Sequence, residues 1–432
     1  MDNSLFILGG SSIYIPQLLV AMEKSDLLKN FKKITLFGRD LSKLEYISQF
    51  GQSLAKKQNL STIVDYTSNF DVCLNDEYNI IFNQIRFGGM EARNNDEQIA
   101  IKNNFVADET LGIVGIPNAI RSIIMLTPYL ETLQKKKNDY TFINFTNPAS
   151  IITQYITSTF HKNTLGICDY PQVFKNKIAD FLQYKRDEIN IKYFGLNHFA
   201  VVYDVLKNDK SIYNDFKSKI DDFQHKLSIQ KHFDYTFVIP SWEYIFYKET
   251  CNKKQQEKEK NRAAVLLDIE KEFSEYISKK PPIEFPPMLK KRNCEWYEVG
   301  IIPLFQFYFN KDSKKEMVVN VDYKEDIFNL GIKNTIVETN ANYKNGILEP
   351  TKINESLKNS LQFQYLSLMK KVEITLLDGI LKRDFNKIIE ASLCNPMVQS
   401  AEGIYRFFSE VLEKDSFFYS NFPNLKNTKF FI

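Results

Sequence analysis

This sequence of 432 residues has few cysteines, little net charge and no long hydrophobic segment. Its five cysteines are scattered and odd in number, and no CxxC pair occurs. This pattern argues against a disulfide framework and predicts free thiols in a reducing compartment. No stretch of about 18 apolar residues exists, and the first apolar run, at 5–8, is too short for a signal peptide. We therefore expect a cytoplasmic protein.

The charge balance excludes a nucleic-acid-binding footprint. The chain carries 56 Lys and Arg against 53 Asp and Glu, with a net charge of +3 and both signs interspersed. Its hydrophobic fraction of 44% is typical of a globular protein with a real core, and its length favours two lobes. We expect a small-molecule partner, with neither nucleic acid nor membrane.

Strand-like and helix-like segments alternate over the first 150 residues. The expected strands are 5–8, 34–37, 79–82 and 140–145, and the expected helices between them are 15–22, 41–54 and 116–133. Such alternation predicts an α/β fold with a doubly wound parallel sheet. The second half instead contains antiparallel-like strands and long closing helices, at 262–276, 317–321, 335–339, 362–381 and 388–412. We predict a Rossmann-like domain at 1–165 and an α+β catalytic and oligomerisation half at 166–432.

The first strand ends in a glycine-rich turn, Gly9-Gly10-Ser11-Ser12, before a helix. Backbone N–H groups at a helix N-terminus cradle a pyrophosphate, and the first βα turn is where a dinucleotide fold places them. The usual GxGxxG is absent. After the second strand, Gly38-Arg39 replaces the acidic residue that binds a ribose hydroxyl in NAD-binding folds. Arg39 would suit a 2′-phosphate, so NADP or dual use stands beside NAD, and a plain surface charge is the alternative.

A thiol and an imidazole follow two strand-like runs. Cys168 and Asp169 come directly after the run 165–167, and His198 follows a turn after 191–194. Ligands bind at the carboxyl ends of strands in open α/β sheets. Thiolate and imidazole suit a divalent transition metal, with positions left open for substrate oxygens. A packed core cysteine is the alternative.

Two arginines and two tyrosines complete the candidates. Arg86 and Arg93 flank a glycine turn and predict an oxyanion or phosphate clamp, with an ion pair to Asp96 or Glu97 as the alternative. Tyr244 and Tyr247 share a helix face, for which packing is the simplest interpretation.

These stretches occur together, and in this order, in one known family. The sequence resembles glycoside hydrolase family 4, the NAD- and manganese-dependent 6-phospho-glycosidases and their α-galactosidase relatives. The match covers nearly the whole chain, in residues 9–12, 16, 86–93, 96–97, 109–110, 112, 144–148, 166–169, 171, 195–198, 244–247, 262–263, 269–272 and 395–396.

The resemblance implies a role for each matching residue. Cys168 and His198 match the metal ligands, Tyr244 the catalytic base and Arg262 the arginine that helps to set it. Arg93 matches the arginine that binds the sugar phosphate. The positions that line the sugar are Glu109 and Asn147, and the glycine turn at 9–12 matches the cofactor loop.

The family chemistry that this implies is oxidation of the sugar at C3 by NAD⁺, removal of the C2 proton and elimination of the aglycone. Water then adds and the hydride returns. Cys-Asp before a proline accompanies the 6-phospho-α-glucosidases, so Asp169, as a proton donor to the leaving oxygen, favours the α anomer. The family's β-specific enzymes and unphosphorylated α-glycosidases are the alternatives. A homodimer or homotetramer is expected.

The sequence also departs from the family pattern. Ser11 replaces the third glycine of the first turn, and Asn293-Cys294 follow Arg292 in place of two glycines. When the sequence is compared with the family pattern without gaps, Trp242 falls at the position of the catalytic base. An NAD(P)-dependent dehydrogenase and a non-catalytic sugar- or cofactor-binding protein therefore remain as alternative hypotheses.

Overall fold

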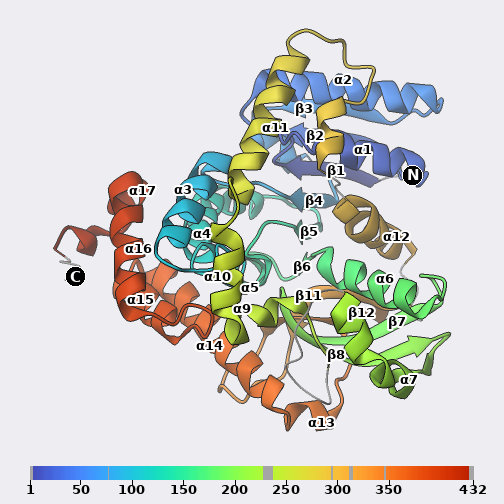
Figure 1. Cartoon of the computed structure of the whole chain (residues 1–432). Helices are drawn as coiled ribbons and strands as arrows, with labels where there is room; N and C mark the ends of the chain where they lie inside the picture. Colours follow the sequence, from blue (N-terminus) through green and yellow to red (C-terminus); the bar gives the residue numbers. More distant parts are fainter. Residues whose placement is uncertain are drawn as a thin grey trace.

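One sheet runs through the molecule. The computed structural model describes residues 3–75, 77–226, 237–292, 295–310, 315–344 and 347–427. The strand order in the sheet is β10-β8-β7-β12-β11-β6-β5-β4-β1-β2-β3, and Figure 1 shows the strands descending from β3 at the top to β8. Because strands from both predicted halves pair in this sheet, the two halves share a continuous backbone framework.

The N-terminal part of the sheet is parallel. Its strands are β1 (Asn3–Leu8), β2 (Phe31–Phe37), β3 (Ile63–Thr67), β4 (Ile80–Asn83), β5 (Thr141–Asn144) and β6 (Thr164–Gly166). Their order, β3-β2-β1-β4-β5-β6, reverses direction between β1 and β4. Such a reversal opens a crevice at the carboxyl ends of the strands, where ligands bind.

Helices cover both faces of this part, so β1 is buried on both sides. Phe6 and Leu8 belong to one hydrophobic core, and Leu5 and Ile7 belong to the core on the other face. A parallel strand that is buried on both faces has a continuous apolar sequence, and this run predicts β1 correctly. The helices are α1 (Ile15–Lys24), α2 (Leu41–Lys57), α3 (Gly89–Lys102), α4 (Gly115–Leu133) and α5 (Ala149–Thr159).

The C-terminal part of the sheet is antiparallel. It joins the parallel part where Asn320 of β11 pairs with Gly166 of β6. Its strands are β7 (Ile189–Leu196), β8 (Phe199–Lys207), β9 (Lys210–Ser211), β10 (Phe237–Val238), β11 (Met317–Tyr323), β12 (Thr335–Lys344) and β13 (Ile347–Pro350).

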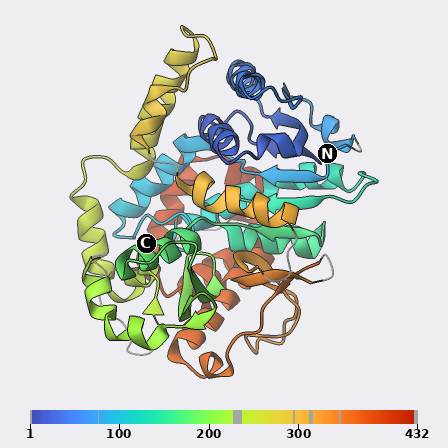
Figure 2. The same cartoon turned by 90° about the vertical axis from the view of Figure 1, so that its right-hand side faces the viewer.

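Further helices surround this sheet. Figure 2 shows α11 rising beside the N-terminal part, while α14 to α16 form the far layer. These helices are α6 (Tyr170–Leu182), α9 (Glu243–Phe246), α10 (Lys248–Gln256), α11 (Arg262–Ile277), α12 (Ile302–Asn310), α14 (Leu361–Lys382), α15 (Phe385–Cys394) and α16 (Ala401–Lys414).

The predicted strands and most of the predicted helices are confirmed, but the segment 388–412 forms two helices, α15 and α16, because Pro396 holds Asn395 in an extended conformation. Several elements were not predicted, β3 and α3 among them. Strand β3 escaped prediction because it is an edge strand whose side chains are mostly half-exposed or exposed. Helix α3 escaped because its mixed, polar sequence lacks a clear apolar stripe. The boundary between 165 and 166 and the homo-oligomer stay predictions.

The described cysteines are free thiols at positions 73, 168, 251 and 394, and Cys294, with Asn293, lies outside the described residues. Among the described residues, no helix is long and apolar enough to cross a membrane.

Candidate active site

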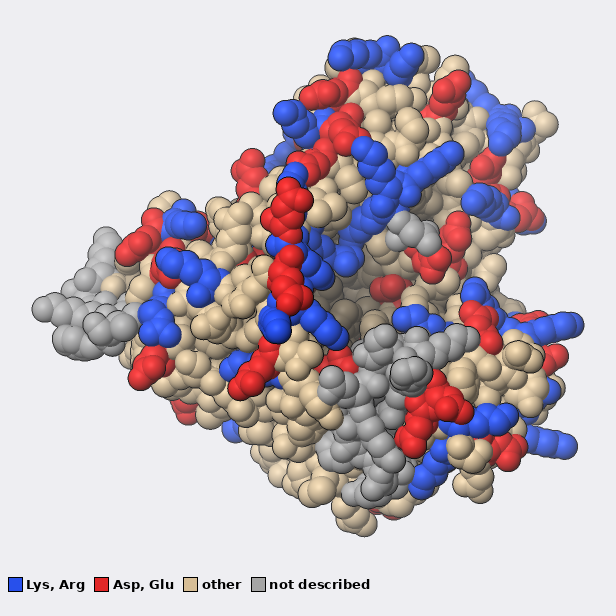
Figure 3. All heavy atoms as spheres, in the orientation of Figure 1, with Lys and Arg blue, Asp and Glu red and all other residues tan. Residues whose placement is uncertain are grey.

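A cavity of about 850 Å³ opens at the carboxyl ends of β1, β4, β5 and β6. Figure 3 shows it as a hollow in the face turned to the viewer, with Lys and Arg side chains along its upper wall. Every predicted site residue except Gly10 lines it, namely Gly9, Ser11, Ser12, Arg39, Arg86, Arg93, Glu109, Asn147, Cys168, Asp169, His198, Tyr244 and Arg262. The structure thus brings together residues that are up to 253 positions apart in the sequence.

The glycine turn differs from our expectation in its hydrogen bonds. The N–H groups of Gly9 and Gly10 both donate to the carbonyl of Phe37, at 3.1 and 2.7 Å, so they are not free to bind a phosphate. Gly10 instead allows close packing, because a Cβ there would lie 2.6 Å from the Cβ of Leu36. Helix α1 begins only at Ile15, which leaves Ser11 and Ser12 exposed to the cavity.

The end of β2 also lies against this turn. A Cβ at Gly38 would come within 2.6 Å of Ser11 Oγ, so the serine hydroxyl fills the space beside Gly38. Arg39 is exposed and lines the cavity.

Cys168 and His198 lie side by side in the lining of the same cavity. Cys168 follows β6, and His198 stands in the turn between β7 and β8 with a φ of 62°. Their Sγ and Nε2 atoms are 3.2 Å apart. Burial raises the pKa of Cys168 well above its ordinary value, and the carboxylates of Asp169 and Glu338 act in the same direction. Without a cation, the thiol therefore stays protonated.

The remaining acidic and thiol groups do not complete a metal cage. In the part of the chain that the structure describes, no group of three or more His, Cys, Asp and Glu side chains could hold a metal ion. The Cys168–His198 pair fits a site of two protein ligands, in which substrate or water oxygens supply the others.

A buried polar network, which the sequence did not reveal, supports this pair. Glu338 of β12 accepts hydrogen bonds from the Tyr193 hydroxyl at 2.7 Å, from Asn197 at 3.0 Å and from Asn320 at 3.1 Å. Asn197 directly precedes His198. Glu338 is 1% exposed, so these donors replace its hydration.

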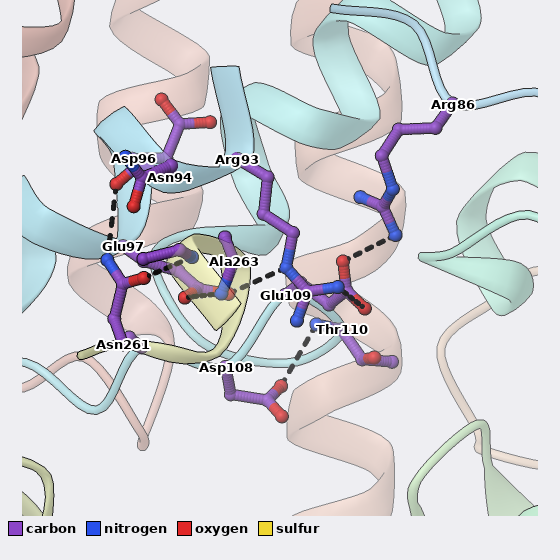
Figure 4. A network of polar contacts seen from close by, with 12 residues as sticks. Arg86, Arg93, Asn94, Asp96, Glu97, Asp108, Glu109, Thr110, Asn261 and Ala263 are labelled. Carbon is purple, nitrogen blue, oxygen red and sulfur yellow. Dashed lines mark hydrogen bonds and ion pairs between the residues drawn. The ribbon is translucent and has the colours of Figure 1, made fainter. Parts of the chain in front are cut away.

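Glu109 joins the two predicted arginines. Its carboxylate lies 2.6 Å from Arg86 and 2.9 Å from Arg93, as Figure 4 shows. Burial alone would raise the pKa of Glu109, but the positive charges of Arg86 and Arg93 outweigh this effect and lower the pKa to about 2. Arg93 also pairs with Glu97 at 2.6 Å, which was one of the two predicted alternatives, while Asp96 pairs with Arg121. The charge of Arg93 is therefore already compensated.

Two further arginines line the cavity without a carboxylate partner among the described residues. Arg262 begins α11 and lines the cavity. Arg292 also lines it, and its guanidinium carbon lies 4.7 Å from the ring centroid of Tyr14 and 4.4 Å from that of Trp296. Burial lowers the pKa of Arg262, and the charges of Arg292 and Arg93 lower it further. An anion in the cavity would relieve this repulsion.

Tyr244 and Trp242 occupy different environments. Tyr244 of α9 lines the cavity, whereas Trp242 is fully buried, stacks on Phe199 at 4.1 Å and donates to the Ala200 carbonyl. The tryptophan is thus a packing residue, and the tyrosine alone of the two faces the site. Burial raises the pKa of Tyr244, and Arg262 opposes this shift.

The other predicted residues, and some that the sequence did not single out, also reach the cavity. Burial raises the pKa of Asp169, and the charge of His198 opposes it. The backbone carbonyl of Asn147 accepts from Asn118 at 2.8 Å. The unpredicted lining residues include Gln84, Lys43 and Ser241, which belong to no motif of the sequence.

Two family models cover this fold and site. The chain matches the model of family 4 glycosyl hydrolases over residues 4–184, and the model of that family's C-terminal domain over 193–398. The chain therefore belongs to family 4 of the glycosyl hydrolases. This confirms the predicted family and the prediction of a glycosidase, and it favours neither the dehydrogenase nor the non-catalytic binding protein.

Individual relatives agree. The chain is 25% identical to the 6-phospho-beta-glucosidase BglT of Thermotoga maritima, over 94% of this chain and 97% of that protein. A structure of the Thermotoga maritima 6-phospho-beta glucosidase with manganese, NAD⁺ and glucose-6-phosphate is similar with a TM-score of 0.80, at 22% identity over 97% and 99% of the two chains. A 6-phospho-alpha-glucosidase from gut microorganisms, with NAD and glucose-6-phosphate, has a TM-score of 0.84 at 19% identity over 97% and 99%. These similarities confirm the predicted fold.

Proposed function

We propose that this chain hydrolyses 6-phospho-α-glucosides with the help of a nicotinamide dinucleotide and a divalent metal ion. The observation that carries the proposal is the Cys168–His198 pair, 3.2 Å apart, on the wall of the cavity that the glycine turn and the arginines also line. The named relatives act on 6-phospho-glucosides, and solved relatives hold NAD, manganese and glucose-6-phosphate.

The donor set fits a divalent transition metal such as Mn²⁺, with Cys168 and His198 as its protein ligands. Ser11 and Ser12 line the side of the cavity where a dinucleotide would lie. When bound, the two groups would supply Lewis-acid polarisation and reversible hydride transfer. The two serines follow β1, and the metal-binding pair follows β6 and β7, and all four residues line the same cavity.

The phosphate of the substrate belongs at the arginine cluster. Arg93 offers N–H donors, but Glu97 and Glu109 compensate its charge. The positive charge available for a phosphate dianion therefore comes from Arg262 and Arg292, with Arg86 beside them. Guanidinium groups bind phosphate through paired, charge-assisted hydrogen bonds.

Tyr244 and Asp169 are the proton-handling residues of this proposal. Tyr244 takes the C2 proton of the sugar. Burial raises its pKa in this structure, and the charge of Arg262 opposes that rise. Asp169, whose pKa is raised by burial, is the residue that would give a proton to the leaving oxygen. Glu109 and Asn147 line the space left for the sugar hydroxyls.

The β anomer is the second candidate. The Thermotoga maritima relative, which matches 94% of this chain, is named as a 6-phospho-beta-glucosidase, while structures named for either anomer have similar TM-scores, 0.80 for the β-named one and 0.84 and 0.79 for two α-named ones. Asp169, as a proton donor beside the metal pair, favours the α anomer in our proposal.

A panel of nitrophenyl glucosides tests the proposal. It contains the α and β anomers, each with and without a 6-phosphate, and is run with and without Mn²⁺ and dinucleotide. We expect release only from the 6-phospho-α-glucoside, and only with both cofactors. Release from the 6-phospho-β-glucoside alone would contradict the proposed preference for the α anomer. Release from unphosphorylated substrates without dinucleotide would contradict the whole proposal.

A further inference from the structure

The corner of the cavity beside β2 has an unusual set of side chains for an NAD site. In an NAD-binding fold, an acidic residue at the end of this strand binds the ribose 2′-hydroxyl. Gly38 occupies that place here, and the hydroxyl of Ser11 fills the space that a side chain would take, since a Cβ at Gly38 would lie 2.6 Å from Ser11 Oγ. An acidic side chain at this position would therefore collide with Ser11.

The nearest acidic residue, Asp40, does not replace the missing one. Its carboxylate accepts the backbone N–H of Lys43 at 3.1 Å and so caps the N-terminus of α2. Asp40 does not line the cavity, whereas Ser11, Gly38, Arg39 and Lys43 do.

The charges at this corner favour an anion. Lys43 lies 3.1 Å from Glu270 and 3.5 Å from Asp40, so carboxylates compensate it. Arg39 is exposed and forms no ion pair within the described ranges, which leaves its charge free. The N-terminus of α2, two residues further on, adds a partial positive charge. The hydroxyl of Ser11 and the guanidinium of Arg39 are thus the groups here that can bind an anion, while Lys43 is held in an ion pair with Glu270, which also lines the cavity.

We propose that the dinucleotide of this chain is NADP, with its 2′-phosphate bound by Arg39 and Ser11. This inference rests on the proposed function, because it identifies the cofactor of that same cavity. A neutral ribose hydroxyl gains little from an exposed guanidinium. A phosphate dianion gains charge-assisted hydrogen bonds from it, and Arg commonly accommodates the 2′-phosphate in NADP-binding folds.

Calorimetric titration of the full chain with NADP⁺ and with NAD⁺, without sugar or metal, tests this inference. We expect NADP⁺ to bind about tenfold or more tightly than NAD⁺. Arg39→Ala should remove most of that preference by weakening NADP⁺ alone. Lys56→Ala is the matched control, since Lys56 is an exposed cation of α2 outside the cavity.

The outcomes separate this inference from the proposed function. Tighter binding of NAD⁺, or an equal loss of both affinities in Arg39→Ala, would overturn the NADP assignment and leave the proposed function standing. Binding of neither dinucleotide would overturn both.

Discussion

The Sγ atom of Cys168 lies 3.2 Å from Nε2 of His198, across thirty positions of sequence. The two residues come from different strands, since Cys168 follows β6 of the parallel part and His198 follows β7 of the antiparallel part. The continuous sheet, through β11 and β12, fixes their separation. The metal site that we propose therefore depends on the joint between the two parts.

Loss of either residue should abolish metal-dependent hydrolysis. In Cys168→Ser and His198→Ala we expect Mn²⁺ affinity and turnover to fall by about a hundredfold or more. Even the loss of a residue that only hydrogen-bonds to a metal ligand lowers metal affinity or activity by up to about a hundredfold. Electron paramagnetic resonance titration of Mn²⁺ measures the affinity directly. Cys394→Ser, at an exposed free cysteine, is the control. Unchanged affinity in both variants would refute the site.

Glu338 should act on the same site without touching it. Its carboxylate holds Asn197, the residue before His198, at 3.0 Å. In Glu338→Gln we expect Mn²⁺ affinity to fall by about tenfold, since the amide cannot accept from all its present donors. Glu349→Gln on neighbouring β13 is the control. If Glu338→Gln lowers the melting temperature but leaves Mn²⁺ affinity unchanged, the network has a purely structural role.

Arg292 should contribute to phosphate binding rather than to chemistry. In Arg292→Gln we expect the KM for a 6-phospho-glucoside to rise by roughly tenfold or more, with a smaller change in kcat. The control is Lys291→Gln, because Lys291 is exposed and pairs with Glu272 outside the cavity. Equal KM values for wild type and Arg292→Gln would exclude Arg292 from the phosphate site.

Glu109 should give the protein a pH-dependent contribution to stability. Its pKa is lowered to about 2 in the folded protein, so its stabilisation is complete above about pH 4.5 and declines as the pH falls toward 2. At pH 7 we expect Glu109→Gln to lower the free energy of unfolding by about 3 kcal/mol, because it leaves Arg86 and Arg93 less compensated.

Denaturant titrations from pH 7 to pH 3 would measure this difference. The gap between wild type and Glu109→Gln should narrow as the pH falls below about 4.5. Glu91→Gln, at an exposed glutamate of α3, should stay within about 0.5 kcal/mol of wild type. A gap that is constant with pH would show that the ion pairs do not stabilise the fold.

Much of the fold follows from local patterns. The continuous apolar run of β1 and the alternation with helices predicted the parallel sheet, because such strands are buried on both faces. The pairing of β6 with β11 was not predictable, because the sequence of neither strand indicates that an antiparallel strand pairs with the edge of the parallel sheet.

The site was predictable only in part, and its hydrogen bonds least of all. Residues directly after strands, such as Cys168, were found because the carboxyl ends of parallel strands converge. Gly9 and Gly10 were interpreted as phosphate donors, but the carbonyl of Phe37 takes their N–H groups. Glu338 was missed because a single carboxylate in an apolar strand gives no sign that distant amides will surround it.

The choice between Tyr244 and Trp242 also needed the structure. They are two positions apart in the sequence, and an ungapped comparison with the family favoured the tryptophan as the counterpart of the base. Burial of Trp242 against Phe199 separates them, because a side chain without exposure cannot meet a substrate.

Deuterium incorporation at C2 tests the central claim most directly. Hydrolysis of the 6-phospho-glucoside in D₂O should place deuterium at C2 of the released glucose 6-phosphate, because in our proposal Tyr244 removes that proton and solvent replaces it. Tyr244→Phe should lose both hydrolysis and exchange, while Tyr247→Phe, outside the cavity, should retain them. Hydrolysis that proceeds with no deuterium at C2 would contradict the account.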